Sequence, residues 1–213
     1  MNTIPACFVA PSYATHLVSE WIPALEDVME KLERGAHVAD VGCGHGASTI
    51  LLAKAFPKSQ FSGFDYHEPS LVRAHELARE GGVDDWITFQ HASAKEFPGT
   101  YDLVAFFDCL HDMGDPVGVA AHVKSTLKSG GTWMIVEPFA RDRMADNLNP
   151  ISRIFYSAST QICVPASLSQ EIGLALGAQA GEARLREVIL SGGFSSVRRS
   201  TATPFNLVME ARP

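Results

Sequence analysis

The sequence predicts an α/β fold in which a mostly parallel β-sheet is covered by helices on both faces. Between residues 37 and 136, short apolar runs alternate with amphipathic stretches, which is the pattern of strands joined by crossover helices. The runs LVAFF (103–107) and WMIVE (133–137) are apolar without alternation, as expected for strands that are buried on both faces. The chain has 213 residues, which is long enough for one substantial core.

The predicted elements follow one another in a regular order. Strands are expected at 38–42, 60–66, 87–92, within 101–110 and at 132–137. Helices are expected at 47–56, 70–80 and 117–128. Pro57 ends the first helix, and Pro69 lies in the first turn of the second, where its missing N–H does no harm. A turn at Gly130–Gly131 separates the third helix from the fifth strand.

The segments outside this alternation differ in character. A helix at 182–194 precedes two strands, 195–202 and 205–212, which are close enough to pair antiparallel. Residues 138–181 have no clear strand signal, and a long insertion at the carboxyl ends of strands usually handles substrate. We therefore expect a helical cap segment at 1–34 and one domain at 35–213, with a lid at 138–181.

Composition excludes several classes of protein. The chain is 46% hydrophobic and 19% charged with a net charge of −7, which is ordinary for a globular protein and unsuited to a general nucleic-acid binder. No apolar run approaches the roughly 20 residues of a membrane helix, and the N-terminus lacks a secretion-signal pattern. The four cysteines are scattered without a CxxC pair, which indicates reduced thiols in a cytoplasmic protein. No HxH or HExxH spacing is present, so no metal site is expected.

The stretch HVADVGCGHGAST (37–49) is the strongest local signal. Gly42, Gly44 and Gly46 follow the first strand directly, at the sheet edge where open α/β folds bind ligands. A phosphate-binding loop of the GxxxxGK[ST] type needs a lysine that is missing here. A dinucleotide site has GxGxxG, whereas this loop is GxGxG with Asp40 ahead of it, and that charge is unfavourable beside a pyrophosphate.

A cationic ligand with a ribose suits the same residues better. Asp65 closes the second strand 25 residues after Asp40, where a carboxylate can accept both ribose hydroxyls. S-adenosylmethionine has a ribose, no phosphate, an ammonium and a sulfonium, so it satisfies every feature of the loop. The alternative is a tight turn from strand to helix with a buried aspartate and no ligand.

From residue 37 to its C-terminus the chain resembles the class I S-adenosylmethionine-dependent methyltransferases. The resemblance implies a Rossmann-like sheet of seven strands in the order 3-2-1-4-5-7-6, with the last strand antiparallel. It also implies that the cofactor is held by residues that follow the first four strands. These are Asp40, Gly42, Cys43 and Gly44 around the methionine and ribose, Asp65 at the ribose, Tyr66, Ser93 and Ala94 at the adenine, and Asp108 at the methionine end. Ser93 stands where the family often has an aspartate.

The stretch FFDCLHDMGDP (106–116) bears on the acceptor of the methyl group. His111 and Glu137 follow the fourth and fifth strands, so both emerge at the edge where the methyl group would lie. Histidine can take a phenol or carboxyl proton near neutral pH, and Glu137 could orient the imidazole or bind the acceptor directly. The alternatives are that His111 caps the next helix and that Glu137 faces solvent.

The segment LHDMGDP is also similar to the HDWSD-type segment of small-molecule O-methyltransferases that carry an N-terminal winged-helix domain. There the histidine is the general base and a glutamate assists it, and His111 and Glu137 match those positions. Met113 and Gly114 replace the usual tryptophan and serine. The winged-helix domain, which supplies dimer contacts in such relatives, has no counterpart here, so the chain is either a short catalytic domain or a fragment. A homodimer remains one expected assembly.

We therefore expect a methyltransferase that uses S-adenosylmethionine, acts on a small organic acceptor and methylates oxygen. Methyl transfer to carbon or nitrogen is the alternative within the enzyme class. A regulatory module that binds the cofactor without turnover is the alternative outside it. A nicotinamide oxidoreductase is disfavoured by Asp40 and by the GxGxG spacing.

Overall fold

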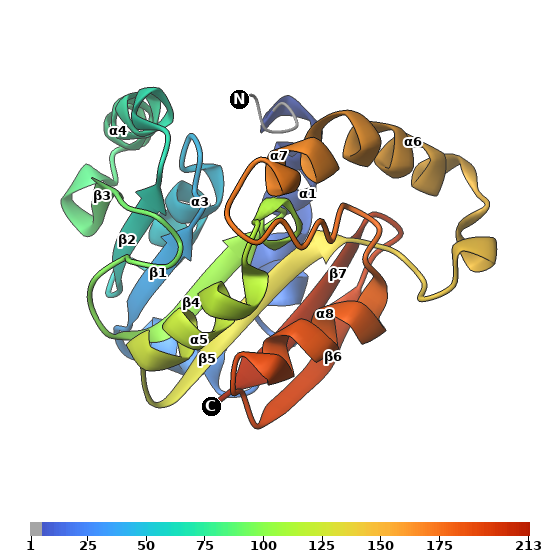
Figure 1. Ribbon diagram of the computed structural model, residues 1–213. Coiled ribbons are helices and arrows are strands. Elements are labelled where there is room, and N and C mark those ends of the chain that lie inside the picture. The colour runs from blue at the N-terminus through green and yellow to red at the C-terminus, as the bar shows by residue number, and fades with distance from the viewer. Residues whose placement is uncertain (1–5) are drawn as a thin grey trace.

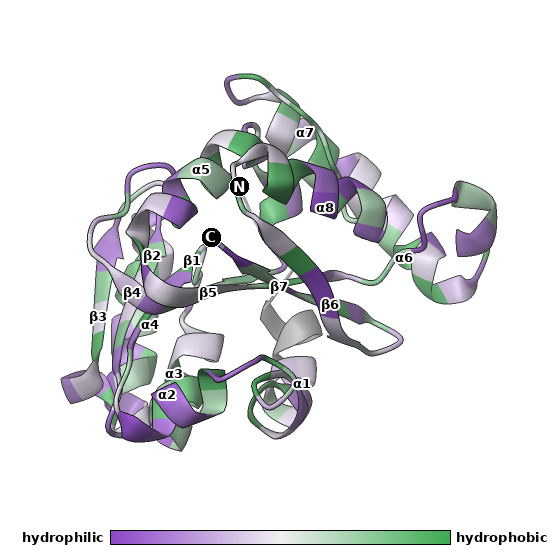
Figure 2. Cartoon of the chain, turned by 90° about the horizontal axis from the view of Figure 1, so that it is seen from below, coloured by the Kyte–Doolittle hydropathy of each residue, from purple (hydrophilic) through white to green (hydrophobic). Residues whose placement is uncertain are grey.

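The computed structural model describes residues 6–213, so the first five residues of the predicted cap segment lie outside it. A single twisted sheet forms the middle layer, and helices lie on both of its faces (Figures 1 and 2). In the view from below, α1, α2 and α3 cover one face, and α5 and α8 cover the other (Figure 2). The predicted α/β fold class is confirmed.

The sheet has seven strands in the order β3-β2-β1-β4-β5-β7-β6, as the family resemblance implied. Strands β1 to β5 pair in parallel, and the last strand, β7, is antiparallel to both of its neighbours. The strands are β1 (His37–Val41), β2 (Gln60–Asp65), β3 (Ile87–His91), β4 (Tyr101–Phe107), β5 (Leu127–Pro138), β6 (Ser196–Ala202) and β7 (Asn206–Arg212).

The helices agree with the predicted alternation to within a few residues in the parallel part of the sheet. They are α1 (Ala6–His16), α2 (Val28–Arg34), α3 (Ala47–Ala55), α4 (Glu68–Gly81), α5 (Pro116–Thr126), α6 (Pro150–Ala158), α7 (Val164–Leu168) and α8 (Gly181–Ser191). Short π-helical turns follow α1 at Leu17–Trp21 and α6 at Ser159–Cys163. The Asp115 side chain caps α5 by accepting the Gly118 N–H at 2.8 Å, so His111 is not the cap.

Strand β4 shows why both faces of the sheet must be covered. Leu103, Ala105 and Phe107 belong to the hydrophobic cluster under α1 to α4, while Val104 and Phe106 belong to the cluster under α5 and α8. Side chains alternate between the faces of a strand, so an unbroken apolar run supplies two cores at once.

Strand β5 begins earlier than the sequence predicts. Leu127 already pairs with Tyr101, and the next paired residue is Thr132 opposite Leu103, so the residues between them bulge out of the sheet. Gly130 has φ +72 in this bulge, which explains why the sequence predicts a turn there. The predicted turn therefore lies within the strand that it was expected to precede.

After Pro138, the last residue of β5, the predicted lid contains no strand and instead carries α6 and α7. Figure 1 shows this segment, in orange, over the end of the sheet to which the arrows of β4 and β5 point. The carboxyl edge of the sheet is therefore covered by the inserted helices on one side and approached by α1 on the other. Among the described residues, no helix combines the length and the apolar character needed to cross a membrane.

Candidate active site

The glycine loop is anchored to the neighbouring strand by its backbone. The N–H groups of Gly42 and Cys43 both donate to the Phe64 carbonyl, at 2.8 and 3.1 Å. Gly42 and Gly44 have φ values of +75 and +53, which favour glycine. A Cβ added at Gly42 would meet the Cys109 Sγ at 2.8 Å, whereas one added at Gly44 would meet nothing within 4 Å. Gly42 is thus required by packing, and Gly44 faces open space in which a ligand can lie against the backbone.

Asp65 is held rigidly at the end of β2. Its Oδ2 accepts the Gly44 N–H at 2.8 Å, and its Oδ1 accepts the His67 N–H at 2.9 Å. Each carboxylate oxygen keeps a second acceptor position. The predicted ribose acceptor is therefore oriented by the same loop that faces the open space.

Asp40 lies under the loop and is almost fully buried. Its Oδ2 accepts the hydroxyls of Ser48 and Thr49, at 2.6 Å each, in the first turn of α3. Burial raises the pKa of Asp40 to about 6, against the lowering effect of the two hydroxyls. Its Oδ1 is also buried and has no hydrogen-bond partner among the described residues. A carboxylate with an unfilled acceptor beneath the loop that carries Gly44 fits a cationic cofactor.

The predicted adenine-side residues follow β2 and β3. The Tyr66 ring is 64% exposed, and the Tyr66 carbonyl lies 3.0 Å from the His91 Nε2. The Ser93 hydroxyl donates to the Glu96 carboxylate at 3.0 Å, within its own turn. Ala94 is half-buried and next to it in the chain. An exposed aromatic ring beside these residues is available to stack on a planar ligand.

Asp108 ends β4 in a left-handed conformation, with φ +51, which is unusual for an aspartate. Its Oδ2 accepts the Tyr13 hydroxyl from α1 at 2.6 Å, and its Oδ1 lies 3.4 Å from the Asn206 Nδ2 of β7. Burial and the nearby Glu137 charge raise the pKa of Asp108 to about 7, although the Tyr13 hydrogen bond opposes the shift. Sequence reasoning missed Tyr13 and Asn206, because nothing in their spacing links them to Asp108.

The structure brings the predicted pair His111 and Glu137 into contact. Glu137 is only 2% exposed, which excludes the solvent-facing alternative. Its Oε1 accepts the Leu110 N–H at 2.9 Å, and its Oε2 pairs with the His111 Nδ1. Burial lowers the pKa of His111, but the Glu137 charge outweighs it, so the pKa lies well above the ordinary value for histidine. With Nδ1 bound to the carboxylate, Nε2 is the nitrogen left for other chemistry.

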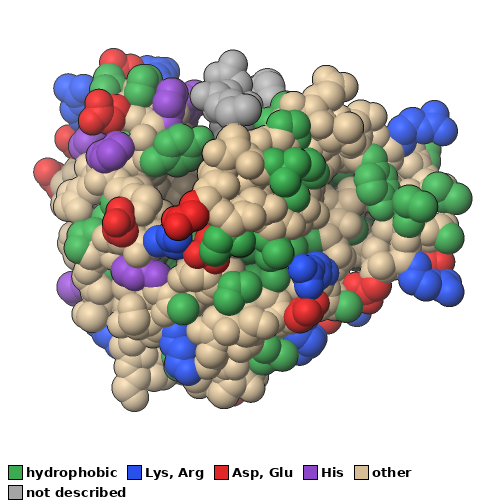
Figure 3. Space-filling view, viewed as in Figure 1, with side chains coloured by type: hydrophobic (Ala, Val, Ile, Leu, Met, Phe, Trp, Pro, Cys, Tyr) green, Lys and Arg blue, Asp and Glu red, His purple; other side chains and the backbone are tan. Residues whose placement is uncertain are grey.

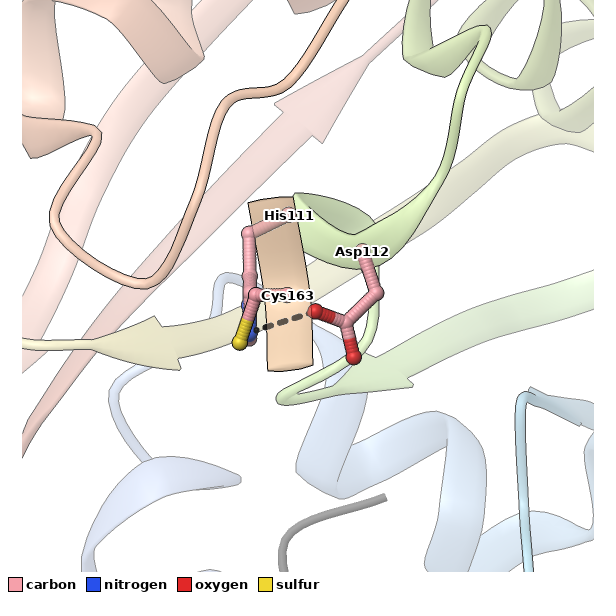
Figure 4. A group of neighbouring side chains, drawn as sticks. All are labelled: His111, Asp112 and Cys163. Atoms are coloured by element: carbon pink, nitrogen blue, oxygen red, sulfur yellow. Dashed lines mark ion pairs between the residues drawn. The ribbon is translucent and has the colours of Figure 1, made fainter. Parts of the chain in front are cut away.

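The free side of this imidazole faces two residues that the sequence did not connect with it. The His111 Nε2 lies 3.2 Å from the Asp112 Oδ1, and Cys163 comes in from the turn after α6 (Figure 4). In the sequence, nothing but its place inside the predicted lid drew attention to Cys163. Burial raises the pKa of the Cys163 thiol, although the nearby His111 opposes this shift.

The α7 segment, which we define as residues 164–170, is held against the turn at His111 by hydrogen bonds. The Ser167 hydroxyl donates to the Met113 carbonyl, and the Gln170 amide accepts from the Gly114 N–H, both at 2.9 Å. The same amide donates to the Asp112 carbonyl at 2.9 Å. A Cβ at Gly114 would meet the Gln170 Cβ at 2.5 Å, so only glycine permits this approach. His111 is 1% exposed as a result.

Shallow surface depressions elsewhere do not coincide with these residues. One is lined by Asp142, Glu182 and Arg186, and another by Lys128, Gly130 and Arg212. Neither contains a residue that the sequence predicts to bind the cofactor or the acceptor. The chemistry-bearing side chains gather instead at the carboxyl edge, between the glycine loop and the inserted helices.

The family is shown by a comparison with protein-family models. A family model described as a methyltransferase domain matches residues 32–176. The chain is 32% identical over 106 residues to 27-O-demethylrifamycin SV methyltransferase of Amycolatopsis mediterranei, a match that covers 48% of this chain and 39% of that protein. It is 29% identical over 124 residues to dimethylglycine N-methyltransferase of Parasynechococcus marenigrum, covering 57% of this chain and 44% of that protein.

A solved structure described as PigF with SAH has a similar fold. Its TM-score is 0.70 at 17% identity, and the match covers 97% of this chain and 56% of that chain. The chain therefore spans less than two thirds of the length of each of these relatives.

Proposed function

Because the chain belongs to the methyltransferase-domain family, we propose that it transfers a methyl group from S-adenosylmethionine to an oxygen atom of a small organic acceptor. The observation that carries the choice of oxygen is the buried contact between His111 and Glu137 at the carboxyl edge. A hydroxyl needs its proton removed as it attacks, and this pair supplies a base.

The residues around the glycine loop fit the cofactor. Gly44 offers backbone against open space, Asp65 offers two oriented acceptors, and Asp40 offers a buried negative charge to the cationic end. Tyr66 would stack on the adenine, with Ser93 and Ala94 beside it, while Cys43 and Asp108 would line the methionine end. Bound there, S-adenosylmethionine supplies a methyl carbon that is activated by positively charged sulfur.

The work of the chain is to position the acceptor, remove its proton and exclude water. Glu137 holds the His111 Nδ1, so Nε2 can accept the acceptor's proton, and the imidazolium that forms is stabilised by the carboxylate. The α7 segment closes over the imidazole and keeps bulk water away. Orientation of the acceptor opposite the sulfur supplies much of the remaining rate enhancement.

Methyl transfer to nitrogen or carbon is the second candidate within this class. The N-methyltransferase among the relatives supports it, since an amine can attack without a base. A regulatory module that binds the cofactor without turnover is the candidate from another class. Each predicts a different outcome in the same experiment.

The test is methyl transfer to a panel of phenols, carboxylic acids and amines, followed by mass spectrometry, with wild type and His111→Ala. We expect methylated phenols or acids, and a loss of on the order of a hundredfold or more in His111→Ala. His75→Ala, on the exposed face of α4, is the control and should retain full activity. Methylation of amines at an unchanged rate in His111→Ala would establish the second candidate. Binding of S-adenosylmethionine without any product would establish the regulatory module.

The assembly and organisation of the chain belong to the same proposal. We expect a homodimer, because Met144, Leu148 and Ile154 expose large apolar side chains around α6 (Figure 3). Sedimentation velocity measures this directly. A cap at 1–34, a domain at 35–213 and a cytoplasmic location complete the proposed description.

A further inference from the structure

His111, Asp112 and Cys163 form a compact group of three different donor atoms. One ring nitrogen of His111, one Asp112 carboxylate oxygen and the Cys163 Sγ all lie within 4.8 Å of one another (Figure 4). The ring nitrogen that faces Asp112 is Nε2. The His111 Nε2 and the Asp112 Oδ1 are both buried, and neither has a partner among the described residues that meets hydrogen-bond geometry, although the two atoms lie 3.2 Å from each other. An ion bound by both atoms would supply the directed bonds that their own contact does not.

We propose that these three residues bind one divalent ion of the zinc class. The nitrogen, thiolate sulfur and carboxylate oxygen are all donors that Zn²⁺ accepts, and three protein ligands leave a fourth position for water. Zinc bonds of about 2.0–2.2 Å at the tetrahedral angle separate nitrogen and oxygen donors by about 3.3–3.6 Å. The observed separation between the His111 Nε2 and the Asp112 Oδ1 is 3.2 Å. The side chains thus need only small movements to coordinate an ion.

The surroundings already resemble those of a metal-binding histidine. Such a histidine usually donates its other ring N–H to a carboxylate, which fixes the tautomer and increases the basicity of the ligand nitrogen. Glu137 has this relation to the His111 Nδ1. On binding, the Cys163 thiol loses its proton to solvent, and the thiolate forms the metal–sulfur bond.

Asp112 lies on the solvent side of the group. Its side chain is 22% exposed, whereas His111 and Cys163 are buried, so an ion would reach the group from the Asp112 side. Chain spacing could not reveal this group, because Cys163 lies in the inserted segment and not near His111 in the sequence. The expectation of no metal site rested on that spacing alone.

Occupation of the site would oppose methyl transfer. The ion takes the lone pair of the His111 Nε2 that the general base needs, so a zinc-class ion should inhibit the enzyme. This consequence rests on the proposed function, but binding of the ion does not. We therefore test binding without cofactor or acceptor.

The experiment is calorimetric titration of the metal-free protein with Zn²⁺, together with Co²⁺ as a spectroscopic probe. We expect one ion per chain and a charge-transfer band from thiolate to Co²⁺. Loss of a residue that merely orients a zinc ligand weakens binding by about 10- to 100-fold. Cys163→Ser and Asp112→Asn remove ligands, so each should weaken Zn²⁺ binding by at least about 100-fold, and Cys163→Ser should abolish the band.

Cys109→Ser is the matched control, because Cys109 is a neighbouring thiol whose Sγ hydrogen-bonds the Val41 carbonyl instead. It should leave both the affinity and the band unchanged. Failure of the wild type to bind Zn²⁺ would overturn the proposal, as would undiminished binding in Cys163→Ser and Asp112→Asn. Asp112 is partly exposed, so Asp112→Asn remains informative even if the buried Cys163→Ser does not fold. A protein that binds Zn²⁺ but methylates nothing would refute only the proposed function.

Discussion

Both carboxylate oxygens of Glu137 are bound by the turn that carries His111. One accepts the Leu110 N–H at 2.9 Å, and the other pairs with the His111 Nδ1. A single side chain at the end of β5 therefore fixes both the backbone of this turn and the orientation of its imidazole. It also keeps the pKa of His111 well above the ordinary value, because its charge outweighs the effect of burial.

Replacing Glu137 by glutamine removes the negative charge of this side chain but keeps its size and shape, so it tests the effect of the charge alone. In Glu137→Gln the pKa of His111 falls, because burial is no longer opposed by the carboxylate, and the methyl-transfer rate drops by about 10- to 100-fold. The limb of the pH–rate profile that reports the base should move to lower pH. Rates measured between pH 5 and 9 check this.

Glu210→Gln is the control for a buried glutamate. Glu210 pairs with Arg198 and Arg212 at the other side of the sheet, so its loss should lower stability without moving the pH limb. An unmoved limb in Glu137→Gln would mean that His111 does not titrate in the reaction.

Asp65→Ala should weaken S-adenosylmethionine binding by roughly 1–3 kcal/mol, the usual loss for a hydrogen-bond partner of a buried polar group. The acceptor positions on Asp65 are oriented by the Gly44 and His67 N–H groups, so the substitution removes an already ordered partner. Isothermal titration calorimetry measures the change. Asp85→Ala removes an exposed carboxylate after α4 and should bind like wild type; equal affinity of both variants would show that the ribose contact is misassigned.

Gly44→Ala and Gly130→Ala form a matched pair. Both glycines have positive φ, +53 and +72, and a Cβ at either would meet nothing within 4 Å. Backbone strain of about 1–2 kcal/mol should therefore lower the stability of the two variants equally. Only Gly44→Ala should also weaken cofactor binding, because its methyl group enters the space proposed for the ligand. Thermal melts measure the stability of both variants, and calorimetry measures their affinity for the cofactor. Equal cofactor affinity of the two variants would show that the cofactor does not lie against Gly44.

Asp108 should make the protein less stable as the pH rises. Its pKa is raised from 3.8 to about 7 on folding, so the folded state favours the protonated carboxyl. The associated stability is fully present below about pH 4 and is lost as the pH rises to about 7. Asp108→Asn removes this dependence, so it should melt at a higher temperature than wild type at pH 8 but not at pH 4.

Asp102 should give a pH dependence of stability opposite in sign to that of Asp108, so Asp102→Asn is the matched comparison. Burial would raise the pKa of Asp102, but the Lys128 ammonium and the His37 N–H lower it below its usual value. Its stabilisation is present above that value and is lost as the pH falls, so Asp102→Asn should destabilise the protein at pH 8. Parallel pH profiles for the two variants would contradict the assignment for Asp108.

Much of the fold could be predicted because hydrophobic pattern and crossover spacing determine a parallel sheet. The strands from β1 to β4 begin and end within about three residues of their expected limits, since each lies between clear turn signals. The start of β5 was missed because Gly130 and Gly131 indicate a turn, and a bulge accommodates them inside the strand. The helices of 138–181 were missed because they pack on the sheet edge rather than following its alternation.

The candidate site, like the fold, could be predicted from the sequence only in part. His111 and Glu137 could be brought together from sequence, because parallel strands end at one edge and β4 lies beside β5. Tyr13 and Cys163 could not, since their contacts depend on how α1 and the inserted helices dock. Spacing along a chain carries no information about such docking, and only the three-dimensional structure supplies it.

Gly114 allows the α7 segment to lie directly on the turn that presents the imidazole. His111 is 1% exposed while this contact is formed, so under the proposed function an acceptor should reach the ring only when the contact opens. A larger side chain at position 114 would push Gln170 away. We therefore expect Gly114→Ala to expose the imidazole to solvent and to change the rates at which acceptor and product exchange.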